Sequence, residues 1–281
     1  MLGMIDVGGG VRGAYGAGIM DYCMEKKLNF DYCIGISAGS ANISSFLAGQ
    51  IGRCYRSYTE YMFKTGYMGV GNFLKSHGNY IDLDYIYSTL GNHDGELALD
   101  YDAMQKNPAR FLIIATNAES GEAEYFDAAE EIRLDEYDII KASCCVPVLN
   151  KPYPYKGKLY YDGGISDPIP VARALQDGCD RVVVILTRPR DFYRNPEKDV
   201  KLAGLLKHSY PKAAEAMMMR AERYNRELDL CKEYEEEGRV LLLAPDSIDG
   251  LDTLTKDQQV IKTLYTKGHK DAAKLSKWLN V

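Results

Sequence analysis

The chain has 281 residues, a formal net charge of −6, and hydrophobic residues at 46% of its positions. A chain of this length can bury a sizeable core, and its acidic balance argues against a broad basic face that binds nucleic acid. Its longest apolar runs, such as residues 182–186, are strand-sized and far below the ~20 residues that span a bilayer. Since no signal-peptide pattern opens the sequence, we expect a cytoplasmic protein with one domain over residues 1–281 and no nucleic-acid partner.

The first predicted elements are a strand over residues 4–7 and a helix over residues 14–27, joined by the glycine-rich segment 8–13. The glycines fit the dinucleotide-binding pattern G-x-G-x-x-G, so a cofactor loop is one interpretation. That interpretation requires an acidic residue at the end of the second strand, and Asp31 precedes that strand instead. We therefore favour a cradle of backbone N–H groups that binds an anion beside a helix N-terminus, with a plain structural turn as the other alternative.

Residues 35–39 read Gly-Ile-Ser-Ala-Gly, directly after an apolar strand and at the start of a helical segment predicted over residues 38–48. A strand that turns sharply into a helix around one serine forms a nucleophile elbow. This interpretation predicts a strained backbone at Ser37 and requires Gly35 and Gly39, because a Cβ at either position would collide with the neighbouring chain. A plain Gly/Ser turn is the alternative.

The middle of the chain predicts two strands and a helix, at residues 111–116, 123–126 and 135–143. A further strand over residues 158–161 ends on Asp162, which two glycines follow. An aspartate at the carboxyl end of a strand can face an open site at the edge of a sheet. Taken alone, the same residue is also typical of a turn in which aspartate bonds its own backbone.

Asp167 and Pro168 have the N-cap and first-turn character of a helix that continues to about residue 176. Buried parallel strands are predicted over residues 182–186 and 240–243, and long helices over residues 211–237 and 256–279. This alternation favours a mostly parallel sheet with helices on both faces. We expect a main body over about residues 3–190, with the region 200–281 packed on it.

Four segments, in this order, resemble the patatin-like phospholipase family: residues 8–13, residues 35–39, the Ala-Ser-Cys-Cys-Val-Pro segment 142–147, and the Asp-Gly-Gly segment 162–164. The resemblance covers roughly residues 4–187. It implies a three-layer α/β/α fold and a Ser–Asp dyad that cleaves acyl esters of lipids through an acyl-enzyme. Its partner would be a lipid or acyl-ester substrate.

The resemblance implies that Ser37 is the nucleophile, that Asp162 is its base, and that Gly9, Gly10 and Arg12 lie on an oxyanion loop. The backbone N–H groups of Gly9, Gly10 and Ala38 would bind the oxyanion, each contributing on the order of 3–4 kcal/mol. Arg12 would either add charge or fix the loop. The remaining motif glycines are Gly8, Gly13, Gly35, Gly39, Gly163 and Gly164. The family often has an acidic residue immediately before the glycines, whereas this chain has Val7 there and Asp6 one position earlier.

A serine hydroxyl needs a base within hydrogen-bond reach, and none of the four histidines occupies a distinctive motif: His77, His93, His208 and His269. A carboxylate is therefore a candidate for the direct base. Because aspartate has an ordinary pKa near ~3.9, an apolar site should raise it, and the substrate should be an ester or thioester rather than a peptide. A Ser–His–Asp esterase with His208 or His269 as base is the alternative, and a lipid-binding protein with little turnover is a third.

A tyrosine-dense segment follows the elbow helix, with a slight basic excess from Arg53, Arg56, Lys64 and Lys75. Amphipathic rings suit a lipid-facing mouth, and basic side chains favour anionic headgroups, which makes transient contact with a membrane surface a hypothesis. Packing of short helices onto the sheet is the alternative. The tyrosines are Tyr55, Tyr58, Tyr61, Tyr67, Tyr80, Tyr85 and Tyr87.

The seven cysteines are scattered and include no C-x-x-C pair. Buried free thiols behave as small hydrophobic side chains, so we expect no structural disulfide. No cluster of histidine, cysteine and carboxylate residues has metal-ligand spacing, and we expect neither a metal nor another cofactor.

Overall fold

A computed structural model describes residues 1–64, 66–69, 71, 79–248 and 250–280. Within these residues, eight strands form one sheet in the order β5-β6-β3-β2-β1-β7-β8, with β4 paired to β3. The strands are β1 (Leu2–Asp6), β2 (Tyr32–Ile36), β3 (Arg110–Asn117), β4 (Ala123–Asp127), β5 (Tyr153–Tyr155), β6 (Lys158–Asp162), β7 (Arg181–Ile185) and β8 (Val240–Leu243).

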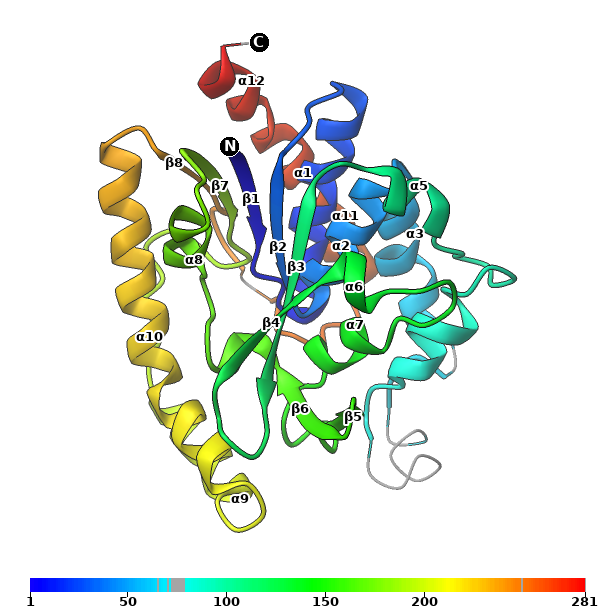
Figure 1. The fold of residues 1–281 in the computed structure, drawn as a ribbon, viewed down its shortest axis with the longest axis vertical. Helices are drawn as coiled ribbons and strands as arrows, with labels where there is room; N and C mark the ends of the chain where they lie inside the picture. Colours follow the sequence, from blue (N-terminus) through cyan, green and yellow to red (C-terminus); the bar gives the residue numbers. More distant parts are fainter. Residues whose placement is uncertain (65, 70, 72–78, 249, 281) are drawn as a thin grey trace.

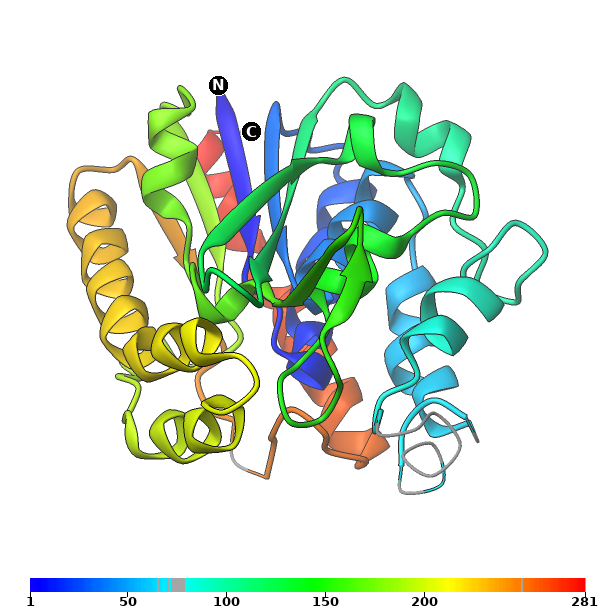
Figure 2. The same cartoon turned by 60° about the horizontal axis from the view of Figure 1, so that its bottom comes forward.

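Five of the strands are parallel, from β3 through β2, β1 and β7 to β8, whereas β4 and β6 run antiparallel to β3 and β5 runs antiparallel to β6. Every residue of β2 is buried, as expected for a parallel strand covered on both faces. Figures 1 and 2 show α10 along one side of the sheet and α1, α2 and α11 on the other. The fold is therefore the mostly parallel, three-layer α/β/α arrangement that the sequence predicts.

The remaining elements are mostly short helices between the strands. In chain order the α-helices are α1 (Ala14–Glu25), α2 (Ala38–Leu47), α3 (Arg53–Thr59), α5 (Tyr101–Lys106), α6 (Ala128–Glu131), α7 (Asp138–Ser143), α8 (Val171–Gln176), α9 (Glu197–Leu206), α10 (Pro211–Glu236), α11 (Gln258–Asp271) and α12 (Ala273–Leu279). Single turns of other helix types are η1 (Gly10–Gly13), η2 (Tyr61–Phe63), η3 (Tyr85–Thr89) and η4 (Gly163–Ile165).

The parallel pairing brings the predicted motifs to one edge of the sheet. Asp6, the last residue of β1, is in register with Gly35 of β2, so the glycine-rich segment and the serine elbow leave the sheet side by side. Asp162 closes β6 opposite Ala115 on β3. The carboxyl ends of parallel strands are where open α/β sheets place their binding sites.

Residues 167–170 are not helical, so the prediction that a helix begins at Asp167 is wrong. α8 begins at Val171, after Pro170. Pro168 and Pro170 explain the delay, because the residue before a proline is disfavoured in helical conformation. The Asp167 carboxylate accepts a hydrogen bond from the Tyr125 hydroxyl and so does not cap a helix.

Two other helix boundaries also differ from the prediction. The segment expected as one helix over residues 256–279 forms two, α11 and α12, with Ala272 between them. The helix expected over residues 135–143 begins only at Asp138, because Asp135 has a φ of 63° and accepts hydrogen bonds from His93. The long helix predicted over residues 211–237 matches α10 closely.

The C-terminal helices pack on opposite faces of the sheet. α10 lies against β8, α8 and η4, whereas α11 crosses α1 closely. A Cβ on Gly18 would lie 2.1 Å from the Tyr265 carbonyl oxygen, and one on Gly268 would lie 2.0 Å from that of Tyr15. Glycines on both helices therefore allow their backbones to approach each other.

All seven cysteines are free and buried. In the part of the chain that the structure describes, no three His, Cys, Asp or Glu side chains gather in a way that could hold a metal ion. No helix among the same residues combines the length and the apolar character needed to span a membrane.

Candidate active site

Ser37 sits on a strained turn between β2 and α2, with a φ of 55° and a ψ of −133°. A positive φ is rare for a residue with a Cβ and costs of order 1–3 kcal/mol. A Cβ on Gly35 would lie 2.6 Å from the Ser40 Cα, and one on Gly39 would lie 2.2 Å from the Asp6 carbonyl oxygen. The turn therefore has both the strain and the glycine requirement that the sequence predicts.

The glycine-rich segment turns against this elbow through three successive residues of positive φ, namely Gly8 at 63°, Gly9 at 124° and Gly10 at 61°. A Cβ on Gly8 would lie 2.2 Å from the Ile36 carbonyl oxygen. Among the described residues, no hydrogen-bond acceptor contacts the N–H groups of Gly9 or Ala38. Two backbone donors beside Ser37 are therefore available to an anion.

The Asp6 side chain stabilises the glycine-rich segment through hydrogen bonds. Its carboxylate accepts hydrogen bonds from the Gly8 N–H and from Asn42 Nδ2, both at 2.9 Å, and Asn42 Nδ2 also lies 2.9 Å from the Gly13 carbonyl oxygen. Burial raises the pKa of Asp6 to about 6, against these two hydrogen bonds. The acidic residue one position earlier than the family pattern thus supports the glycine-rich segment.

Asp162, the last residue of β6, belongs to the same part of the site as Ser37. Its Oδ1 accepts the Gly164 N–H at 2.8 Å, and both Asp162 and Ser37 are buried. Burial is the largest influence on the Asp162 carboxyl and raises its pKa; the cation of Arg220 and the Ser37 side chain act in the opposite direction. The two residues also line the same cavity.

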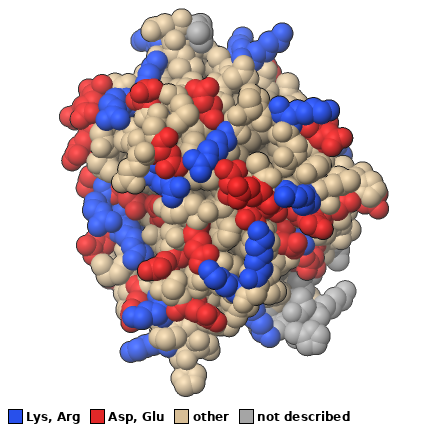
Figure 3. All heavy atoms as spheres, in the orientation of Figure 1, with Lys and Arg blue, Asp and Glu red and all other residues tan. Residues whose placement is uncertain are grey.

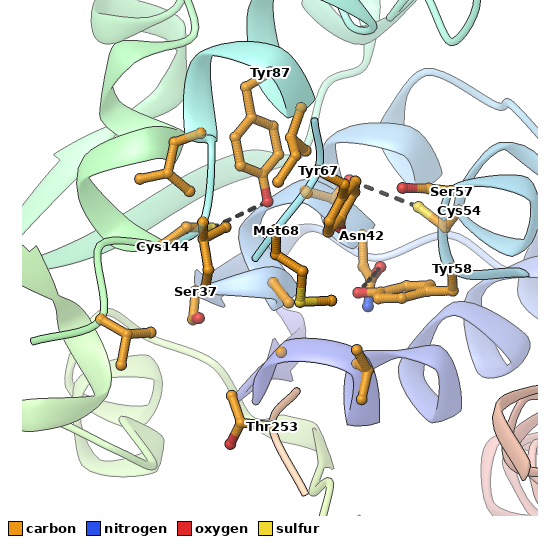
Figure 4. Close-up of a pocket in the computed structure, with 18 of the residues that line it drawn as sticks. Ser37, Asn42, Cys54, Ser57, Tyr58, Tyr67, Met68, Tyr87, Cys144 and Thr253 are labelled. Atoms are coloured by element: carbon orange, nitrogen blue, oxygen red, sulfur yellow. Dashed lines mark hydrogen bonds between the residues drawn. The ribbon is translucent and has the colours of Figure 1, made fainter. Parts of the chain in front are cut away.

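Segment 142–147 fixes the elbow from the other side. Ser143 Oγ accepts the Ser37 N–H at 2.9 Å and donates to the Ile114 carbonyl oxygen at 2.7 Å. The Ser143 side chain therefore ties the elbow to β3. Next to it, Cys144 Sγ lies 3.2 Å from the Tyr87 hydroxyl, as Figure 4 shows.

Ser37 lies where two cavities meet. The first, which we name the apolar cavity, has about 840 Å³ of space including its open mouth (Figure 4). The second, the arginine cavity, has about 720 Å³. Both are lined by Gly10, Ser37, Val146 and Thr253. A molecule bound across the junction would place its middle at the serine.

The tyrosine-dense segment forms much of the apolar cavity. Tyr58, Tyr67 and Tyr87 line it together with Met68 and Leu83. The neighbouring basic side chains have partners inside the protein. Their contacts are Arg53 with Ser45, Arg56 with Glu60, and Lys64 with Glu96, while Lys75 lies outside the described residues. On the described part of the face in Figure 3, acidic and basic side chains alternate without an extended region of one sign.

The arginine cavity contains residues that the sequence reasoning missed. Arg188 and Arg194 lie in the loop between β7 and α9, and Arg220 is on α10. They join Arg12, which the sequence analysis singled out and which is buried there. Arg188 could have been found from its position just past the carboxyl end of a buried parallel strand. Arg220 stands three residues after Met217 and four before Tyr224, within the apolar stripe of α10.

The histidines lie elsewhere. His93 contacts Asp135, and His269 Nε2 lies 2.9 Å from Glu25 Oε2. His93, His208 and His269 line neither cavity, and His77 lies outside the described residues.

The fold and the site together define a class of α/β proteins with a serine elbow, a glycine-rich loop and a buried aspartate at one sheet edge. The family model described as patatin-like phospholipase matches residues 7–175, and the chain belongs to this family. A second model, described as a domain of unknown function (DUF6363), matches residues 210–280.

One relative in sequence and one solved structure are similar to the chain. It is 31% identical over 201 residues to the uncharacterized protein YjjU of Escherichia coli (strain K12), in a match that covers 70% of this chain and 54% of that protein. The chain thus spans about half the length of this curated relative. Its fold is similar to that of VipD from Legionella pneumophila, with a TM-score of 0.55 and 15% identity over 98% of this chain and 66% of that one.

Proposed function

We propose that this protein is a lipid acyl-ester hydrolase in which Ser37 is the nucleophile and Asp162 its base. The observation that carries the proposal is that Ser37, on its strained elbow, lines the same cavity as Asp162, a buried carboxyl whose pKa is raised by burial. A raised pKa makes a carboxylate a better proton acceptor at neutral pH. The strained elbow presents the hydroxyl to the junction of the two cavities.

In the first step the Asp162 carboxylate accepts the hydroxyl proton while Ser37 Oγ attacks the ester carbonyl. The resulting oxyanion is held by the free N–H groups of Gly9 and Ala38, with Gly10 beside them. Collapse breaks the bond to the leaving alkoxide, which takes the proton from Asp162 and departs as an alcohol. Water then attacks the acyl-enzyme with Asp162 again as base, releasing the fatty acid and restoring Ser37.

The apolar cavity is the proposed site for the acyl chain. Most of its wall consists of aliphatic and aromatic side chains such as Ile81, Leu83 and Tyr87, which exclude water from a hydrocarbon chain. Each CH₂ buried there contributes roughly 0.8 kcal/mol. Among p-nitrophenyl esters of graded length, octanoate should therefore give a higher kcat/KM than acetate.

The test compares the wild type with Ser37→Ala, Asp162→Asn and the control Ser209→Ala, an exposed serine outside both cavities. A fluorophosphonate probe should label the wild type and Ser209→Ala, should label Asp162→Asn much more slowly because the base is lost, and should not label Ser37→Ala. Asp162→Asn should lower kcat for p-nitrophenyl butyrate by about 10²–10⁴-fold, the range for loss of a general base. Labelling of Ser37→Ala, or full activity of Asp162→Asn, would refute the proposal.

A further inference from the structure

The arginine cavity brings four guanidinium groups to one side of Ser37. Arg12 comes from the glycine-rich segment, Arg188 and Arg194 from the chain after β7, and Arg220 from α10. The burial of Arg12, together with the other three cations, lowers its pKa to about 10. The four positive charges in this cavity therefore repel one another, and a bound anion would reduce this repulsion.

Two of the four arginines, Arg194 and Arg220, make contacts that stabilise the fold. Arg194 donates from Nε and Nη2 to the fully buried Asp199 at 2.5 and 2.8 Å. Arg220 Nε donates to the Gly164 carbonyl oxygen at 2.6 Å, and its Nη1 lies 3.9 Å from Asp199. These contacts hold α9 and α10 against η4.

The other two arginines lack a carboxylate partner among the described residues. Arg12 donates from Nη1 to Thr253 Oγ1, but its buried Nε has no hydrogen-bond partner there. Arg188 stacks over the Phe192 ring at 4.3 Å from the ring centroid, and no ion pair within the described part of the chain satisfies it. A buried N–H without an acceptor is costly, which makes Arg12 Nε an indication of a missing ligand atom.

The charge balance indicates what the cavity binds. Four guanidinium groups face the carboxylates of Asp199 and Asp162, and the exposed carboxylate of Asp252 also acts on Arg12, so one to two positive charges remain unmatched. A phosphate monoester carries about −1.5 to −2 charges near neutral pH and presents three oxygens. Planar guanidinium groups recognise such oxygens through paired hydrogen bonds.

The position of the arginine cavity relative to Ser37 indicates which part of the substrate bears the phosphate. Gly10, Val146 and Thr253 line both cavities, so an anion among the arginines would lie on the opposite side of Ser37 from an acyl chain in the apolar cavity. We propose that the arginine cavity binds a phosphate monoester on the alcohol side of the scissile ester. The substrate class is then an acylglycerol phosphate such as phosphatidate, an inference that rests on the proposed function.

The first test measures kcat/KM for dioctanoyl phosphatidate and dioctanoylglycerol, which have the same acyl chains, in the same neutral detergent micelles. The wild type should prefer phosphatidate at least tenfold. Arg188→Gln should reduce this preference by about 10-fold, and Arg188→Lys should restore part of it because the charge returns. The matched control is Arg190→Gln, since Arg190 is exposed, pairs with Glu235 and lines neither cavity. No preference in the wild type, or an equal loss on both lipids, would overturn the inference.

A binding experiment covers the case in which an arginine variant folds poorly. Catalytically inactive Ser37→Ala protein is titrated with dioctanoyl phosphatidate, with dioctanoyl phosphatidylcholine and with inorganic phosphate. Phosphatidate should bind at least tenfold more tightly than either of the others. Equally tight binding of inorganic phosphate would show a site for the free anion and overturn the substrate assignment. If no ester is cleaved in a Ser37-dependent way, the proposed function fails; if esters are cleaved without regard to charge, only this inference fails.

Discussion

Arg12 and Thr253 meet at the candidate site although 241 positions separate them: Arg12 Nη1 donates to Thr253 Oγ1 at 3.2 Å. The Val11 N–H also donates to the Thr253 carbonyl oxygen at 3.2 Å, and a Cβ on Gly10 would lie 2.4 Å from that oxygen. The glycine-rich segment is therefore shaped by the loop that precedes α11. The region that matches a domain of unknown function thus completes a site whose motifs lie within residues 8–164.

Replacing Thr253 by valine should loosen this contact. Thr253→Val keeps the backbone hydrogen bond from Val11 but leaves Arg12 Nη1 without its acceptor. Because Thr253 is partly buried, we expect a loss of about 1 kcal/mol in the free energy of unfolding, measured by urea denaturation. The turnover of p-nitrophenyl butyrate should also fall, since Arg12 lies beside the oxyanion loop. Thr263→Val, at an exposed threonine of α11, is the matched control; equal effects from both changes would contradict the expectation.

Gly39 should tolerate no side chain. In Gly39→Ala the new Cβ would lie 2.2 Å from the Asp6 carbonyl oxygen, and backbone on both sides must shift. We expect a loss of about 3 kcal/mol or more in the free energy of unfolding, at the upper end for overpacking. Gly204→Ala is the control, because Gly204 lies in α9 with nothing within 4 Å of the added Cβ. That change should stabilise the protein by roughly 0.5–1 kcal/mol through helix propensity. A harmless Gly39→Ala would show that the elbow can relax.

The elbow, the glycine-rich segment and the parallel strands were predictable because each depends on residues adjacent in sequence. Gly35 and Gly39 flank Ser37, and β2 reads as a continuous apolar run. The order of the motifs then indicates the family. The antiparallel pairing of β6 with β3 has no comparable local signature, because the two strands lie far apart in sequence.

The arginine cavity could not be derived in the same way. Arg194 and Arg220 meet at Asp199, and the distance of Arg220 from Ser37 depends on how α10 packs against η4. The apolar stripe of α10 predicts which face of the helix is buried, but it does not predict which elements that face packs against. The late start of α8 shows the same limit, since N-cap chemistry at Asp167 competes with two prolines and with Tyr125.

The histidines should be dispensable for catalysis. His269→Gln and His208→Gln change residues that line neither cavity, so kcat/KM for p-nitrophenyl butyrate should stay within about twofold of the wild type. A Ser–His–Asp enzyme would instead lose about 10²–10⁴-fold on removal of its base. Such a loss in either variant, with the thermal unfolding midpoint unchanged, would favour that alternative over Asp162.

Arg220 should set the acidic limit of the activity. Asp162 must be ionised to accept a proton, so hydrolysis is lost as pH falls through the pKa of this carboxyl, which burial raises above its ordinary value. The Arg220 cation is the largest influence that opposes this rise. In Arg220→Gln the Asp162 pKa should rise further, and the acidic limb of kcat/KM for the neutral ester p-nitrophenyl butyrate should move to higher pH.

Arg220→Lys is the matched variant, because it keeps the positive charge and changes only the shape of the group. Its acidic limb should stay close to that of the wild type, although the hydrogen bond from Arg220 Nε to the Gly164 carbonyl oxygen is altered. Profiles recorded from pH 4 to pH 9 separate the effect of the positive charge from the effect of the hydrogen bond. The ionic strength is kept constant, since charge screening weakens the influence of a cation. If the acidic limb moves equally in both variants, the role of Arg220 is to hold η4 in place rather than to lower the pKa of Asp162.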